Sequence, residues 1–324
     1  MPPSLPPEAS AAVLAWYDAN GRSLAFRATR DPWAILVSEV MAQQTQVSRV
    51  VDAWSRFMTR FPTVEALTAA TPADVLRAWQ GMGYDRRALN LRRAAIAIRD
   101  DHGGRVPADL AALMRLPGVG PYTARAVLAI AFGKAFGAVD TNVRRVLIRA
   151  VRGLADERAV ALTAAWAQSV ADASVDPSRP GDWTHALMDV GATVCRPRQP
   201  ACEACPLRTW CAFHVSAADR GPDAETEEGR GATADARPRR LPFEASTRWL
   251  RGRILDQLRA TAGPGWVAIA DQIGGHDCEA IEAALAALAR DGAIELRVPA
   301  ELGRRPMARL ATVDLPVARS DGPI

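Results

Sequence analysis

The sequence predicts a mainly α-helical protein of about two domains, followed by a small C-terminal module. Its 324 residues are 49% hydrophobic, which is enough to bury a full-sized core, and the length by itself suggests roughly two domains. From residue 33 to about 152, amphipathic helical patterns alternate with short breaks that contain glycine or proline, and strand signals are nearly absent. Further helical patterns at 157–173 and from 183 onward lead into a cysteine cluster that ends at Cys211.

The last third of the chain has a different composition. Residues 216–246 are rich in small, charged and proline residues and poor in large apolar ones, which predicts a disordered linker. Three short helices and a two-stranded ribbon after it would form a small winged-helix-like module. The helical patterns lie at 249–260, 267–273 and 278–290, and the two alternating segments lie at 293–298 and 306–313.

The charge and the polarity limit the function classes. A net charge of +4 and a pI of about 9.0 mildly favour a polyanionic partner. Lys134 is the only lysine, so nearly all positive charge is arginine, which suits phosphate contacts but cannot form a Schiff base. No apolar stretch approaches the ~20 residues of a membrane helix, and the proline-rich N-terminus lacks a signal-peptide pattern. We therefore expect a cytoplasmic protein with no membrane partner.

Four of the five cysteines are clustered with the spacing C-x6-C-x2-C-x5-C. Four thiolates within such a short segment can ligate one soft metal centre. A structural zinc site usually has two tight pairs, and here only one pair is that tight, while disulfides are disfavoured in the cytoplasm. The spacing thus favours an iron–sulfur cluster but leaves zinc open. The four candidate ligands are Cys195, Cys202, Cys205 and Cys211.

Residues 116–124 read LPGVGPYTA between two helical patterns. Glycines in such a tight turn allow backbone N–H groups to face an anion beside a helix N-terminus, so a DNA phosphate can be bound without reading a base. An ordinary helix-turn-helix corner is the alternative. The residues expected to contact the phosphate are Leu116, Gly118, Val119 and Gly120.

A third motif, SEVMAQQTQ, occupies residues 38–46. Glu39 has apolar neighbours in a predicted helix, and partial withdrawal of its carboxyl group from water would raise its pKa toward that of a general acid working near neutral pH. Considered alone, Glu39 could equally be a solvated glutamate on the outer helix face.

Together the three motifs, with VDTNVRRV at 139–146, resemble the MutY-type adenine DNA glycosylases of the helix-hairpin-helix, endonuclease III superfamily. The resemblance covers about residues 13–213, and Ala42 departs from the more usual leucine. It implies a helix-hairpin-helix DNA glycosylase fold and a 4Fe-4S cluster on the four cysteines. The implied parts are a cluster domain at 8–29 and 136–214, a six-helix barrel domain at 30–135, a linker at 215–246 and a winged-helix-like module at 247–316.

The resemblance also implies roles for the catalytic residues. Glu39 would be the general acid that protonates the departing adenine, and Asp140 would stabilise the oxocarbenium-like sugar. Asn142 and Tyr122 would support the reacting centre. These residue types suit the chemistry, because cleavage of a purine N-glycosidic bond develops positive charge on the sugar and negative charge on the base.

Further residues match positions that bind the substrate in this family. Arg27 and Gln43 match residues that line the adenine pocket. Asp85 departs from the family, which often has a second tyrosine there. The residues that match a wedge inserted into the duplex near the opposing base are Gln44, Met82 and Tyr84.

The implied function is base excision repair by an adenine-specific, monofunctional hydrolase. Its substrate would be double-stranded DNA with adenine opposite 8-oxoguanine or guanine, since a mispaired base costs less to flip out. We expect a nucleoid-associated monomer. One alternative is an endonuclease III-like glycosylase for damaged or mismatched pyrimidines, which uses a hairpin lysine where Tyr122 stands. Another is a non-enzymatic iron–sulfur DNA-binding protein, which would need neither Glu39 nor Asp140.

The C-terminal module lacks the Phe-Ser-His loop of the Nudix-like domain with which MutY proteins commonly end. It resembles instead the short winged-helix-like tail of some actinobacterial-type MutY sequences. Its candidate recognition helix is acidic and its wing is basic, so packing or partner binding is at least as well supported as base reading. The residues concerned are Glu279, Glu282 and Asp291 on the acidic side, and Arg304, Arg305 and Arg309 on the wing.

Overall fold

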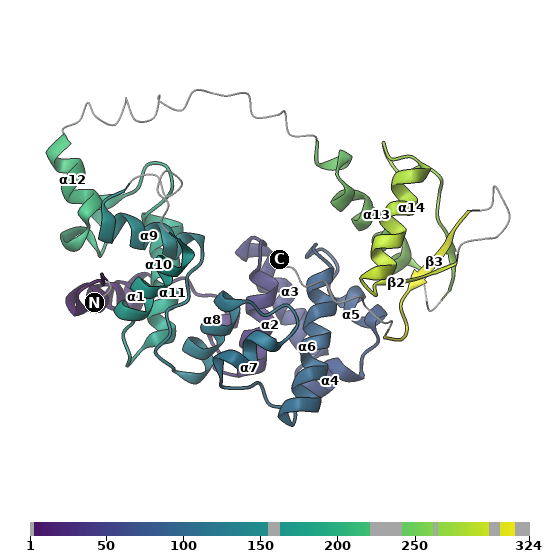
Figure 1. The fold of residues 1–324 in the computed structure, drawn as a ribbon, viewed down its shortest axis with the longest axis horizontal. Coiled ribbons are helices and arrows are strands. Elements are labelled where there is room, and N and C mark those ends of the chain that lie inside the picture. Colours follow the sequence, from purple (N-terminus) through teal and green to yellow (C-terminus); the bar gives the residue numbers. More distant parts are fainter. Residues whose placement is uncertain are drawn as a thin grey trace. The chain divides into compact units, whose positions relative to one another are not determined.

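The fold is mainly helical, as predicted (Figure 1). The computed structural model describes residues 3–154, 163–220, 242–261, 263, 265–297 and 305–314. Within these ranges, no helix is long and apolar enough to cross a membrane. The described residues form two compact units. The first takes in Met1–Glu39, Ala108–Arg115 and Val119–Asp235, and the second Val40–Pro107, Leu116–Gly118 and Ala236–Ile324.

The first unit has its core around Trp183, which is fully buried and donates its indole N–H to Ser10 Oγ at 3.2 Å. Two of its helices end at glycines in the left-handed conformation, Gly133 (φ 61°) and Gly153 (φ 69°). The helices are α1 (Pro7–Asn20), most of α2 (Pro32–Ala42), α7 (Leu110–Arg115), α8 (Pro121–Phe132), α9 (Thr141–Arg152), α10 (Ala164–Ser174), α11 (Pro180–Asp189) and α12 (Ala212–Arg220). Short helical turns lie at Ala25–Arg27, Val190–Val194, Cys202–Ala204 and Arg208–Trp210. Of the helical pattern predicted at 157–173, residues 157–162 lie outside the described ranges.

The second unit begins with four helices around a buried aromatic cluster. Phe57 and Trp79 are fully buried and meet edge to face, with ring centroids 5.7 Å apart. Thr71 and Asp74 form a reciprocal capping box at the start of the third of these helices. The four helices are α3 (Val47–Arg60), α4 (Val64–Ala69), α5 (Pro72–Ala78) and α6 (Arg86–His102).

The C-terminal module belongs to the same compact unit as α5 and α6. Its apolar core, which includes Ile254, Leu285 and Ile294, is continuous with Leu76 of α5 and Leu89 of α6. The module consists of α13 (Thr247–Ala260), β1 (Val267–Ala268), α14 (Cys278–Arg290), β2 (Ile294–Arg297) and β3 (Met307–Leu310). The domain boundaries expected from the sequence stay a prediction, and most of the expected linker lies outside the described residues.

The helix predicted at 267–273 is wrong. Residues 267–268 form strand β1, which pairs antiparallel with β3, so the predicted ribbon is a three-stranded sheet of order β1-β3-β2. So short a segment could not make a stable helix alone, and pairing with β3 supplies partners for its backbone. Of the wing residues, Arg304 lies outside the described ranges.

Candidate active site

The carboxyl group of Glu39 is withdrawn from water in helix α2. Asp31 caps this helix by accepting a hydrogen bond from the Ala34 N–H at 3.0 Å, and Glu39 is 7% exposed among apolar helix neighbours. Burial raises the pKa of Glu39 to about 7, although the hydroxyl of Tyr122 and the charge of Arg27 act to lower it. Within the described residues, Glu39 Oε2 has no hydrogen-bond partner. A carboxyl group in this state can donate a proton near neutral pH.

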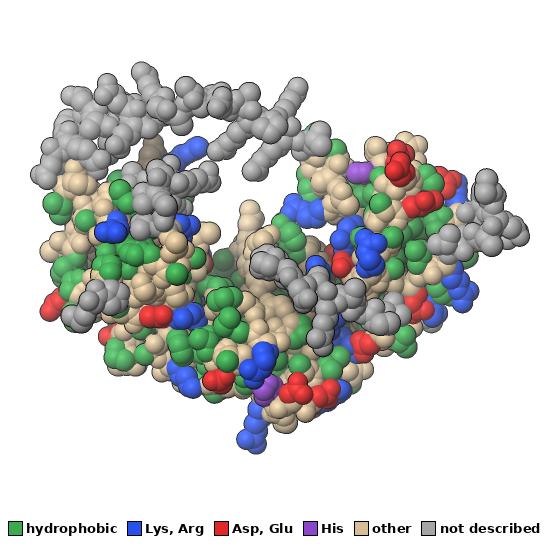
Figure 2. All heavy atoms as spheres, viewed as in Figure 1, with side chains coloured by type: hydrophobic (Ala, Val, Ile, Leu, Met, Phe, Trp, Pro, Cys, Tyr) green, Lys and Arg blue, Asp and Glu red, His purple; other side chains and the backbone are tan. Residues whose placement is uncertain are grey.

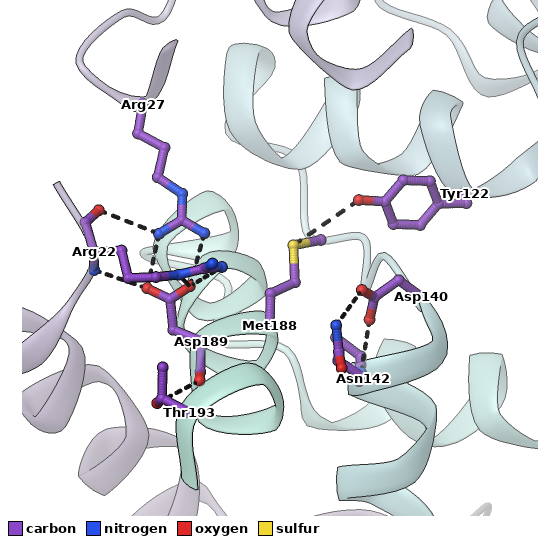
Figure 3. A network of polar contacts seen from close by, with 9 residues as sticks. Arg22, Arg27, Tyr122, Asp140, Asn142, Met188, Asp189 and Thr193 are labelled. Atoms are coloured by element: carbon purple, nitrogen blue, oxygen red, sulfur yellow. Dashed lines mark hydrogen bonds and ion pairs between the residues drawn. The ribbon is translucent and has the colours of Figure 1, made fainter. Parts of the chain in front are cut away.

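Asp140 lies at the N-terminus of α9 as its capping residue. Its Oδ1 accepts a hydrogen bond from the Val143 N–H at 2.7 Å, and its Oδ2 accepts one from Asn142 Nδ2 at 3.1 Å (Figure 3). The carboxylate is close enough to Glu39 to raise the pKa of that residue. Two carboxyl groups, one readily protonated and one held by hydrogen bonds, therefore share one site.

Tyr122 lies in the first turn of α8 and completes this group. Burial raises its pKa well above the ordinary value, and the charge of Glu39 raises it further, so the phenol stays protonated. Its hydroxyl also lies 3.9 Å from Met188 Sδ (Figure 3). Tyr122 is thus a neutral hydrogen-bond donor beside Glu39.

Arg27 is held beside the site by Asp189, a residue that the sequence analysis missed. Both terminal nitrogens of Arg27 donate to the Asp189 carboxylate, at 2.8 and 2.9 Å, and Arg22 donates to it through its backbone N–H and Nε at 2.9 and 2.7 Å (Figure 3). Asp189 is fully buried. Its signal in the sequence is a lone carboxylate inside an otherwise apolar segment near the end of α11.

Asn142 connects the catalytic group to the cysteine segment through Arg145. Arg145 Nη2 donates to Asn142 Oδ1 at 2.9 Å and to the Gly191 carbonyl at 2.6 Å, while its Nε donates to the Cys195 carbonyl at 2.8 Å. The first turn of α9 and the cysteine segment are therefore fixed to one another.

The four clustered cysteines line one cavity together with Arg149, which donates to Cys195 Sγ at 3.4 Å. None of the four forms a disulfide. In the described part of the chain, no three His, Cys, Asp or Glu side chains converge closely enough to hold a single metal ion. Burial raises the pKa of Cys205 to about 12, and neighbouring thiols act in the same direction. Thiolates here would therefore need a cationic centre to stabilise them.

The hairpin motif forms the turn between α7 and α8. Gly118 has φ +79°, and a Cβ there would lie 2.9 Å from Asn90 Cβ, so only glycine fits. Leu116 and Val119 are buried, which leaves their backbone rather than their side chains for a ligand. Gly120 is the exposed N-cap of α8. The phosphate-binding role of these residues stays a prediction.

Two of the three expected wedge residues are exposed, and both have a backbone conformation that side chains rarely adopt. Gln44 has φ +53° and Tyr84 has φ +49°. Such strain persists only where the surroundings enforce it, and it is concentrated at functional positions. Met82, by contrast, is 2% exposed and its side chain packs in the core, and the wedge role of the three residues stays a prediction.

The two strained loops are held together by Arg87, which the sequence analysis also missed. Its guanidinium is buried, and burial lowers its pKa to about 10. It donates hydrogen bonds to the segment around Gln44 and to the segment around Tyr84. These hydrogen bonds fix the backbone of both residues. The acceptors are the carbonyl oxygens of Val40, Met41, Gln43, Met82 and Gly83 and the hydroxyl of Thr45. Gln43 in turn donates from Nε2 to the Gly118 carbonyl at 3.3 Å.

Comparisons with known proteins identify the family. A family model described as "HhH-GPD superfamily base excision DNA repair protein" matches residues 37–169. The chain is 41% identical over 285 residues to the adenine DNA glycosylase of Mycolicibacterium smegmatis, a match that covers 87% of this chain and 91% of that protein. It is 42% identical over 254 residues to the adenine DNA glycosylase of Mycobacterium tuberculosis, which covers 78% and 79%. A solved structure of a thermostable thymine-DNA glycosylase superposes with a TM-score of 0.57 at 29% identity, over 64% of this chain and 95% of that one.

Proposed function

The chain belongs to the adenine DNA glycosylases of the HhH-GPD superfamily, and from that premise we propose that it is a monofunctional, monomeric enzyme that removes adenine mispaired with 8-oxoguanine or guanine. The observation that carries the proposal is the pairing of Glu39, whose pKa is about 7, with Asp140 in one site. DNA binding alone has no use for two carboxyl groups near a polyanion. Adenine excision needs both.

In the proposed mechanism Glu39 donates a proton to the departing adenine. Burial raises its pKa to about 7, so the carboxyl can carry a proton near neutral pH, and its buried Oε2 has no hydrogen-bond partner among the described residues. Asp140 stays in place through its two hydrogen bonds and stabilises the positive charge that develops on the sugar. Tyr122 donates a hydrogen bond within the same group. Water then adds to the sugar, and the strand is left with an abasic site.

The position of the only lysine supports a hydrolase without strand-cleaving activity. Lys134 follows the C-terminal end of α8, and its Nζ donates to the Ala108 carbonyl at 2.5 Å. Tyr122 stands at the other end of the same 12-residue helix, about 18 Å away along the axis. Arginine side chains remain protonated and cannot form a Schiff base in its place.

We further propose that Cys195, Cys202, Cys205 and Cys211 hold a 4Fe-4S cluster with a structural role. Four thiols line one cavity, and their C-x6-C-x2-C-x5-C spacing contains only one tight pair, which suits a polynuclear centre better than zinc. When bound, the cluster would supply the positive iron charge that stabilises the thiolates. Anaerobically purified protein should contain iron and sulfide with visible absorption, and stoichiometric zinc without visible absorption would contradict the assignment.

The proposed mechanism is tested by Glu39→Gln and Asp140→Asn. Each should retain binding to a duplex with adenine opposite 8-oxoguanine, because each acts on charge that develops only in the transition state. Single-turnover excision should fall on the order of a hundredfold or more. A variant that excises adenine at the wild-type rate would show that the residue has been assigned wrongly.

A further inference from the structure

Helix α13 of the C-terminal module holds the loop that carries Tyr84 at two points. Arg248 donates a hydrogen bond to the Tyr84 hydroxyl, and its Cζ lies 4.9 Å from the centre of the tyrosine ring. Arg259 forms an ion pair with Asp85, the next residue, and donates from Nε to the Leu76 carbonyl at 3.0 Å. Arg248 and Arg259 are eleven residues apart, about three helical turns, so they lie on the same face of α13.

The pair of Asp85 and Arg259 is largely buried, with side-chain exposures of 16% and 5%. A buried carboxylate that lost its cation would be strongly destabilising, so this pair fixes α13 against the start of α6. Asp85 is one of the residues at which the sequence departs from the related family. The structure gives it a partner from the module, which ties the module to the strained loop rather than leaving it as a separate appendage.

The contact also creates an exposed surface of alternating aromatic and guanidinium groups. Arg248 Cζ lies 4.8 Å from the centre of the Phe243 ring as well, and Phe243 and Tyr84 are 51% and 37% exposed. In the space-filling view, arginine side chains gather over α13 (Figure 2). Aromatic rings and guanidinium planes bind unstacked nucleobases through their π faces, and phosphates attract the same cations.

We propose that Tyr84, Arg248 and Phe243 form one DNA-contacting surface, through which the C-terminal module takes part in recognising the base opposite the adenine. The proposal rests on the proposed function and on the match of Tyr84 to a wedge position near the opposing base in the related glycosylases. The bound group is the purine opposite the adenine, in the strand from which no base is removed. Tyr84 and Phe243 contact this purine, and the guanidinium of Arg248 holds it. The acidic helix α14 has no part in it.

The test uses the full chain and three variants, Arg248→Ala, Phe243→Ala and the control Arg253→Ala. Arg253 lies on the same helix, is 53% exposed, forms an ion pair with Asp256 and lies over the Trp249 ring with its Cζ 5.9 Å from the ring centre, so it matches Arg248 in charge and in its aromatic neighbour but is not in contact with Tyr84 among the described contacts. The probes are duplexes with 2′-fluoro-2′-deoxyadenosine opposite 8-oxoguanine or guanine, and a fully paired duplex, at one salt concentration. Fluorescence anisotropy gives Kd for each.

Arg248→Ala and Phe243→Ala should each weaken binding to the mispaired duplexes roughly tenfold, as expected for loss of one stacking contact. Binding to the paired duplex should change less than about twofold, and Arg253→Ala should behave as the wild type. An equal loss on paired DNA, or no difference between Arg248→Ala and the control, would overturn the proposal.

Arg248→Lys separates stacking from simple charge. Lysine keeps the charge but lacks the planar group, so the mispair-specific loss should remain if Arg248 stacks and should disappear if it contacts only a phosphate. Recovery of wild-type binding would overturn the proposed contact. Wild-type excision of adenine, measured on the same preparation, distinguishes this failure from a failure of the proposed function.

Discussion

Replacement of Glu39 by glutamine should make the protein more stable while it lowers the excision rate on the order of a hundredfold or more. The ordinary pKa of this carboxyl, 4.5, rises to about 7 in the folded protein because burial penalises the charged form. The folded state therefore holds the proton more tightly than the unfolded state, and stability is lost as pH rises from about 4.5 to about 7. Each pKa unit corresponds to about 1.4 kcal/mol, so the loss reaches about 3 kcal/mol above pH 7. Glutamine carries no charge at any of these pH values, so the variant avoids this loss of stability.

The assay compares thermal and urea unfolding of the wild type and Glu39→Gln at pH 5 and pH 8, both purified in the same way. The variant should gain little at pH 5 and should be more stable by up to about 3 kcal/mol at pH 8. Glu8→Gln makes the same chemical change at an exposed position of α1 and should show no such difference between the two pH values. A stability gap for Glu39→Gln that is the same at both pH values would refute the assignment of a raised pKa.

Three further predictions concern Glu39, Asp189 and the hairpin turn. Single-turnover excision should be constant below pH 7 and fall tenfold per pH unit above it, because Glu39 must be protonated; a rate that rises across this range would contradict its role as the acid. Asp189→Asn should lower the stability of the fold by about 3 kcal/mol in thermal unfolding, since the buried Arg27 would lose its carboxylate, and an unchanged Tm would exclude this. Gly118→Ala should weaken DNA binding and lower the stability of the fold, because the new Cβ would meet Asn90. Gly103 also has a positive φ but is surrounded by open space, so Gly103→Ala should lower the stability less. Equal losses of stability would argue against the close contact at Gly118.

The sequence predicted features that depend on local patterns. The order of helices up to α9 follows the apolar periodicity, and the breaks fall at the glycines and prolines that punctuate it. Apolar neighbours of Glu39 correctly indicated its burial, and the clustered cysteines do line one cavity. These features are short-range, so the residues that create them are visible side by side in the chain.

What the sequence did not reveal depends on long-range contacts. Asp189 reaches Arg27 across 162 positions, and Arg87 reaches the Gln43 carbonyl across 44, so the local sequence does not identify the partner of either residue. Strand β1 was mistaken for a helix because its partner β3 is some 40 residues away in the chain. Met82 matches a wedge position by its place in the motif, yet its side chain is drawn into the core.

The most direct test of the account is a single-turnover reaction on a duplex with adenine opposite 8-oxoguanine, in which the free base and the DNA strand are analysed separately. The account predicts release of adenine from a strand that stays intact until heat or alkali cleaves it, because no side-chain amine stands near the reacting sugar. Borohydride should trap no more than a faint adduct that survives Lys134→Arg. Spontaneous strand cleavage, with a strong adduct that disappears in Lys134→Arg, would contradict the account, as would binding of the duplex without any release of adenine.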